Sequence, residues 1–157
     1  MDSRQFRNAM GKYATGVTVI STQVGECVHG MTANAFMSVS LEPPLVVVSI
    51  DQHASMLDKI SESQTFAVNI LAEGQQYLSQ HFAGKPEASN SIPWEELEGY
   101  PVIGDTVAQV VCDVVATHVE GDHTLFIGQV KALRVEDRQP LLFFNGRYSK
   151  LAVEQHI

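Results

Sequence analysis

The sequence GMTANAFMSVSLEPPLVVVSI, residues 30–50, decides the fold. Its first part alternates neutral polar with apolar side chains, and residues 45–50 are almost continuously apolar. Successive side chains of a β-strand point to opposite faces, so the polar set shares one face if the segment stays extended. This set is Thr32, Asn34, Ser38 and Ser40. We therefore expect a strand with one polar face, followed by a strand in the core.

The polar face has two interpretations. It could be the solvent face of an edge strand, because half-buried strands alternate in this way. It contains no charged side chain, however, and it leads directly into an apolar strand, which favours a ligand pocket. A flat, uncharged ring with hydrogen-bonding edges, such as an isoalloxazine, suits this face better than a bare metal ion or a nucleic-acid backbone.

The rest of the chain predicts a mainly β fold with short helices. Ser3 is expected to cap a first helix that lids one end of the fold, and residues 54–63 and 74–82 have helical spacing. Residues 84–101 are expected to form a long surface excursion. Strands are expected at residues 17–22, 27–40, 45–50, 66–72, 107–119, 124–135 and, last, 141–144. Many β segments with short helices between them predict a mostly antiparallel, closed or nearly closed barrel.

Composition limits the classes of protein that fit. A length of 157 residues predicts one domain, residues 1–157. The net charge of −8 disfavours nucleic acid and anionic membranes as partners. No apolar stretch is long enough to span a bilayer, which predicts a cytoplasmic protein. Cys27 and Cys112 have no zinc or redox spacing, and we expect both to be buried thiols.

Two basic or hydroxyl groups are candidates for phosphate binding. Ser55 lies near the start of a predicted helix, where free backbone amides bind anions. The alternative is that Ser55 or Asp51 only caps this helix. Lys85 follows a glycine and either reaches a phosphate or is an ordinary exposed lysine.

Two further groups lie at predicted turns. The segment HVEGDH has the length of a tight hairpin and holds His118, Glu120, Asp122 and His123. It could bind a metal ion, but a turn histidine held by Asp122 needs less unusual geometry. Arg147 and Tyr148 follow a glycine near the last predicted strand; they either contact a ligand or close the end of the barrel.

Five segments resemble, in order and spacing, the flavin reductase family of the FMN-binding split-barrel fold. This family comprises the small reductase components of two-component flavin monooxygenases. The matching segments are FRNAMGKYATGVTVIST, GMTANAFMSVSLEPPLVVVSI, FAVNILAEGQQYLSQHFAG, GDHTLFIGQV and PLLFFNGRY. The resemblance implies an NAD(P)H:flavin oxidoreductase that passes hydride from NADH or NADPH to FMN or FAD. It also implies a homodimer with each flavin close to the subunit interface, and a separate monooxygenase that uses the reduced flavin.

The resemblance also assigns roles to single residues. Thr32, Ala33 and Asn34 match the segment that contacts the isoalloxazine ring. The stretch Ser38, Val39 and Ser40 matches positions along the ribityl chain and phosphate. His123 matches a histidine near the nicotinamide, and Tyr148 an aromatic residue near the flavin. The positions that match those around the phosphate are Ser55, Phe82, Ala83, Gly84 and Lys85.

The chain departs from the family pattern at two places. Met37 replaces a small hydroxyl residue, and DQHAS, residues 51–55, replaces a more basic or serine-rich turn. A flavin held weakly for this reason would act as a substrate. Two other hypotheses stay open at this point: a non-catalytic flavin carrier or sensor on the same barrel, and a small metal-dependent β-barrel enzyme that uses residues 118–123.

Overall fold

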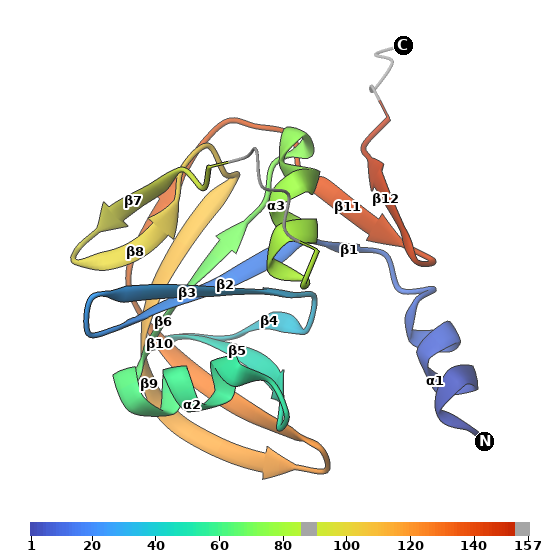
Figure 1. Ribbon diagram of the computed structural model, residues 1–157, viewed down its shortest axis with the longest axis horizontal. Helices are drawn as coiled ribbons and strands as arrows, with labels where there is room; N and C mark the ends of the chain where they lie inside the picture. The colour runs from blue at the N-terminus through green and yellow to red at the C-terminus, as the bar shows by residue number, and fades with distance from the viewer. Residues whose placement is uncertain (86–90, 153–157) are drawn as a thin grey trace.

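A computed structural model describes residues 1–85 and 91–152 of the chain. It has a β-rich body from which the first helix stands apart (Figure 1). The helical elements are α1 (Ser3–Met10), α2 (Ser55–Ser63), the 3-10 turn η1 (Glu73–Gln75) and α3 (Gln76–Phe82). The strands are β1 (Thr15–Gly16), β2 (Thr18–Val24), β3 (Cys27–Ala33), β4 (Phe36–Leu41), β5 (Pro44–Asp51), β6 (Thr65–Ile70), β7 (Trp94–Leu97), β8 (Tyr100–Ile103), β9 (Ala108–Glu120), β10 (His123–Val135), β11 (Leu141–Phe144) and β12 (Arg147–Lys150).

The central sheet has seven strands in the order β3-β2-β6-β9-β10-β5-β4, and every neighbouring pair is antiparallel. Its two edge strands, β3 and β4, are consecutive in the chain and are separated only by Asn34 and Ala35. Within the described residues no ladder pairs β3 with β4, so the sheet is open between these two edges. We call the link of Asn34 and Ala35 the seam. The predicted mainly β, antiparallel split-barrel class is confirmed.

The main core lies on the inner face of this sheet. Phe66, Phe126 and Ile50 are fully buried there, and α2 adds Met56 and Ile60. The apolar spacing that predicted α2 therefore marks the face that is buried. Burial of such side chains is the main favourable term in folding. A second buried cluster, of residues that include Val19 and Leu78, lies between the sheet and α3.

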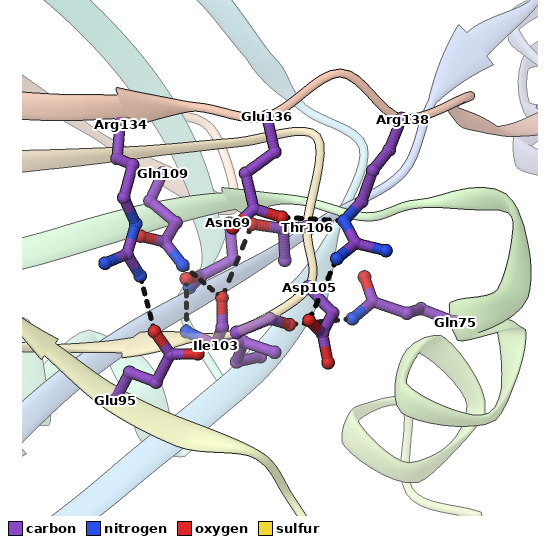
Figure 2. Close-up of polar contacts among 11 residues, drawn as sticks. Asn69, Gln75, Glu95, Ile103, Asp105, Thr106, Gln109, Arg134, Glu136 and Arg138 are labelled. Atoms are coloured by element: carbon purple, nitrogen blue, oxygen red, sulfur yellow. Dashed lines mark hydrogen bonds and ion pairs between the residues drawn. The ribbon is translucent and has the colours of Figure 1, made fainter.

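A buried network of amide side chains attaches β8 to the sheet (Figure 2). The Asn69 side chain accepts a hydrogen bond from the Ile103 amide at 2.8 Å and donates to the Val19 carbonyl at 2.9 Å. The Gln109 side-chain amide donates to the Ile103 carbonyl, and that of Gln75 donates to the Gly104 carbonyl at 2.9 Å. A buried polar group without a partner destabilises the folded protein. Moving the hairpin of β7 and β8 would break these bonds, so they fix its position.

The ends of the chain differ from expectation in three ways. Asp2, not Ser3, caps α1: its carboxylate accepts from the Gln5 amide at 2.8 Å. The prediction that α1 lids the fold is wrong for the single chain, because none of its residues is buried. Residues 141–144 are not the last strand, because Asn145 and Gly146 turn the chain into β12. Asn-Gly is the commonest two-residue hairpin signal, so the sequence already contained this turn.

Two other predictions also need correction. The excursion at residues 84–101 contains β7 and the start of β8, joined through Glu98 and Gly99; its residues 86–90 lie outside the described part. Cys112 is buried as expected, whereas Cys27 is exposed at the start of β3. Among the described residues no helix is long and apolar enough to cross a membrane.

Candidate functional site

The predicted continuous polar strand is interrupted twice. It breaks at the seam, where β3 ends and β4 begins on the opposite edge of the sheet. A bulge at Val39 then shifts the register, so that Ser38 pairs with Val46 and Ser40 with Leu45. Val46 and Leu45 are adjacent on β5 and point to opposite faces, and paired residues share a face. The prediction that the four polar residues share one face is therefore wrong.

The seam leaves hydrogen-bond donors available. The Asn34 carbonyl accepts from the Phe36 amide at 3.0 Å, and the Ala35 carbonyl accepts from the Ser49 amide at 3.1 Å. Within residues 1–85 and 91–152, the backbone N–H groups of Asn34 and Ala35 have no backbone acceptor. Asn34 and Ala35 are exposed, as are Ser38 and Val39, while Ser40 is half-buried. The seam thus presents two free N–H groups and one side-chain amide beside the core.

Thr32 and Ala33, just before the seam, are fixed by hydrogen bonds to α3 and to β2, respectively. The Thr32 hydroxyl donates to the Ser79 carbonyl of α3 at 2.6 Å. The Ala33 carbonyl accepts from the buried Thr18 hydroxyl, and Ala33 itself is buried in the main core. Because a hydroxyl has one proton, Thr32 can only accept a further hydrogen bond from a ligand.

The end of α3 brings other predicted residues to the outer face of β3. The Phe82 ring lies on Gly30, where an added Cβ would be 2.6 Å from Phe82 Cε1. The Tyr148 hydroxyl of β12 lies 2.7 Å from the Ser79 hydroxyl. Ala83, Gly84 and Lys85, which follow α3, are exposed. Of the predicted set, Thr32, Phe82 and Tyr148 therefore gather around α3.

His123 lies where the β9–β10 hairpin meets β5. It pairs with Asp51, and its Nδ1 is 2.8 Å from Asp122 Oδ1, so the predicted turn histidine held by Asp122 is confirmed. This hydrogen bond and the charge of His123 lower the pKa of the Asp122 carboxyl. Ligand atoms of Asp51, Asp122 and His123 lie within 4.8 Å of one another. His118 and Glu120, the other two residues of the metal hypothesis, are not part of this group.

Ser55 lies at the start of α2, close to the same corner. The Gln52 amide donates to the Asp122 carbonyl at 2.9 Å, which joins the loop before α2 to the hairpin. Neither Ser55 nor Asp51 caps α2: its N-cap is Ala54, which has no capping side-chain bond, and the Asp51 carboxylate accepts from the His53 amide at 2.7 Å. The capping alternative is therefore wrong. Ser55 is exposed, and its hydroxyl is available at this helix start.

The seam, the β9–β10 hairpin and the start of α2 meet at the end of β5. The seam is bonded to Ser49, His123 pairs with Asp51, and Ser55 follows four residues later. The fold thus places the ring-contact candidates, the nicotinamide candidate and one phosphate candidate around one strand end. An open depression of about 560 Å³ lies elsewhere, near the other end of β3. Its lining residues are Gln23, Val28, Trp94, Glu95, Glu96, Gly99 and Pro101.

Two contributors to the site were not predicted. The free amide of Ala35 results from the strand break, for which the alternating pattern gives no signal. Ser79 is buried between β3 and β12, and its contacts come from residues far away in the sequence. Residues three apart lie on the same face of a helix, so the spacing of Ser79 and Phe82 is the only local sign that Ser79 faces the sheet.

Comparisons with known proteins agree with this architecture. Residues 10–152 match the family model of the flavin reductase like domain. An NADH-dependent flavin reductase of a Rhodococcus species is 44% identical over 150 residues, covering 92% of this chain and 84% of the relative. The reductase component of 4-hydroxyphenylacetate 3-monooxygenase from Thermus thermophilus is 36% identical, covering 93% of this chain and 95% of the relative.

Solved structures give the same result. The flavin reductase PheA2 in its native state has a TM-score of 0.95 and 57% identity, covering 98% of this chain and 100% of that chain. The NADH:FAD oxidoreductase SgcE6 of Streptomyces globisporus C-1027, in complex with NAD and FAD fragments, has a TM-score of 0.88 and 37% identity. Its alignment covers 96% of this chain and 93% of that chain.

Proposed function

Because the chain belongs to the flavin reductase family, we propose that it is an NADH-dependent flavin reductase. It transfers a hydride from reduced nicotinamide to FMN or FAD. The observation that supports this best within the fold is the seam, whose free N–H groups and Asn34 amide lie beside the core. Donors of this kind match the carbonyl and nitrogen edge of a flavin ring.

The residues of the chain position the reactants. When bound, the flavin accepts the hydride, and the protein supplies orientation and electrostatics. Backbone donors at Asn34 and Ala35 are fixed by the seam, so they need no rearrangement to face negative charge that develops on a ring. We propose that His123, held at Nδ1 by Asp122, presents its other ring nitrogen to the nicotinamide amide. Ser55 and Lys85 are the proposed contacts of the phosphate.

We also propose that the protein is a homodimer. The outer face of the sheet carries an apolar row in which Met37 pairs with Val47, Val47 with Ile127, and Ile127 with Ala116. These four residues belong to none of the buried clusters, and Met37 is 59% exposed. An interface needs a continuous surface with few charges at its centre, and this row provides one.

A separate monooxygenase is the proposed consumer of the reduced flavin. The Thermus thermophilus relative is the reductase component of 4-hydroxyphenylacetate 3-monooxygenase. A solved structure of 36% identity is the styrene monooxygenase flavin reductase of Pseudomonas putida S12. Since Cys27 and Cys112 are free thiols, a reducing, cytoplasmic location also fits.

Steady-state kinetics test the activity. Oxidation of NADH and NADPH is followed at 340 nm with FMN, FAD or no added flavin. We expect NADH oxidation that depends on the flavin. Flavin binding without any NADH or NADPH oxidation would instead support the non-catalytic carrier.

A single variant tests the role of His123. His123→Ala removes the proposed nicotinamide contact, and we expect the KM for NADH to rise about tenfold while the flavin Kd changes little. The control is His118→Ala, an exposed histidine of β9 outside the group formed by Asp51, Asp122 and His123. An unchanged KM for NADH in His123→Ala would remove His123 from the site.

A further inference from the structure

Ser79 is a buried serine whose two oxygen atoms contact two predicted flavin residues. Its side chain is on α3 and the residue is only 1% exposed. Its carbonyl accepts the hydrogen bond of the Thr32 hydroxyl at 2.6 Å, and its hydroxyl lies 2.7 Å from that of Tyr148. One residue thus links β3, next to the seam, to β12.

The Tyr148 ring packs against the second buried cluster, and the hydrogen-bond partner of its hydroxyl is Ser79. The hairpin of β11 and β12 belongs to a separate three-stranded sheet with β1, not to the barrel sheet. The Tyr148 ring packs edge-on against Phe143 of its own hairpin, with ring centroids 5.1 Å apart. This contact orients the ring within the hairpin but does not connect it to β3. The hydroxyl pair of Ser79 and Tyr148 connects the hairpin to α3, and the Ser79 carbonyl, which accepts from Thr32, connects α3 to β3.

We propose that Ser79 is a positioning residue for flavin binding, which fixes the Tyr148 hydroxyl relative to Thr32 and the seam. This inference rests on the proposed function, because it assumes that Tyr148 and the seam contact the flavin. Ser79 itself touches no ligand in this scheme. Its hydroxyl acts by removing the freedom of the Tyr148 side chain, so that less ordering is needed when the flavin binds.

The fold offers a closely matched control. Thr22 and Ser63 form another half-buried pair of hydroxyls, also 2.7 Å apart, between β2 and the end of α2. Ser63→Ala removes a hydroxyl contact of the same type and length, together with the bonds of that hydroxyl to the Thr65 backbone, away from α3 and β12. A general loss of stability from a missing hydroxyl bond would therefore appear in both Ser63→Ala and Ser79→Ala.

The experiment measures the flavin Kd by fluorescence titration for the wild type, Ser79→Ala, Tyr148→Phe, the double variant and Ser63→Ala. We expect Ser79→Ala and Tyr148→Phe each to raise the Kd about fivefold, the effect typical of one lost hydrogen bond. The double variant should be no weaker than either single one, because both remove the same contact. In Ser79→Ala the KM for NADH should stay at the wild-type value while the flavin Kd rises, and Ser63→Ala should bind flavin normally.

Three results would overturn the proposal. Equal Kd increases in Ser79→Ala and Ser63→Ala would indicate a general structural effect. A wild-type Kd in Ser79→Ala would show that the contact does not position anything, and additive effects in the double variant would show that Tyr148 acts independently of Ser79. Because the Kd needs no turnover, loss of NADH oxidation with normal flavin binding would contradict the proposed function but leave this test intact.

Discussion

The outer face of the sheet is covered on one half and uncovered on the other. Over β2 and β3 it is covered by α3, and over β6 and β9 by the hairpin of β7 and β8, which buries Val102 against Val111. Over β4, β5 and β10 the apolar row around Val47 has no helix or hairpin of the described residues packed on it. The same apolar strand chemistry therefore serves two purposes. One half completes the fold, and we propose that the other half binds a second copy.

The uncovered half gives the largest expected effect. Val47→Glu places a carboxylate in the middle of the apolar row, where a partner copy would bury it without a counter-charge. We expect the dimer Kd to rise at least about 100-fold, because an unpaired buried charge costs several kcal/mol. Analytical ultracentrifugation measures this change.

The control for this variant is Ser61→Glu, which adds the same charge at an exposed position of α2. It should stay dimeric, and both variants should keep the wild-type far-UV circular dichroism. A Val47→Glu protein that self-associates as tightly as wild type would exclude this face as the interface. A monomeric wild type would contradict the proposed homodimer itself.

The covered half is tested at the contact between α3 and β3. Gly30→Ala would place a Cβ 2.6 Å from the Phe82 ring, so the ring and the end of α3 must move. We expect a loss of about 1–3 kcal/mol in the free energy of unfolding, measured by urea denaturation. Gly16→Ala is the matched control, because nothing lies within 4 Å of its added Cβ. Equal stability of the two variants would show that α3 is not tightly packed on β3.

The hairpin over β6 and β9 gives the smallest effect, which is visible only at alkaline pH. Burial and the hydrogen bond to Asp113 raise the pKa of Tyr100 to about 12. The unfolded chain ionises this tyrosine near pH 10, so the contribution of Tyr100 to stability is complete below about pH 10 and is lost as the pH rises towards 12.

Absorbance at 295 nm, compared between wild type and Tyr100→Phe, isolates this ionisation. The difference between the two titration curves should have its midpoint near 12. The unfolding free energy of Tyr100→Phe should also fall less steeply between pH 10 and 12 than that of the wild type. A midpoint near 10 would mean that the hairpin does not shield Tyr100.

Local patterns predicted the elements whose signals are contained in a few neighbouring residues. The spacing of Met56 and Ile60 predicted α2 and its buried face, and the residues around Gly121 predicted the turn between two long strands. The turn at Asn145 and Gly146 has an equally local signal, which could have predicted β12. The positive φ of Glu98, 51°, marks a turn that the sequence signalled only through Gly99.

Other features depend on contacts between distant parts of the chain. The bulge at Val39 is a feature of the pairing of β4 with β5, and no pattern in β4 alone reveals it. Ser79 contacts residues 47 and 69 positions away, so no window of neighbouring residues could assign its role. Burial and register across strands decided both.

The sequence by itself determined the mainly β class, the strand in the core, the turn histidine held by Asp122 and the resemblance to flavin reductases, because each depends on periodicity, turn chemistry or ordered motifs. Only the tertiary structure decided which side chains share a face, that the seam frees two amides, and that half of the sheet remains uncovered. Those properties arise from the pairing of strands that are far apart in the chain. No pattern of neighbouring residues shows this pairing, so it becomes visible only in the folded sheet.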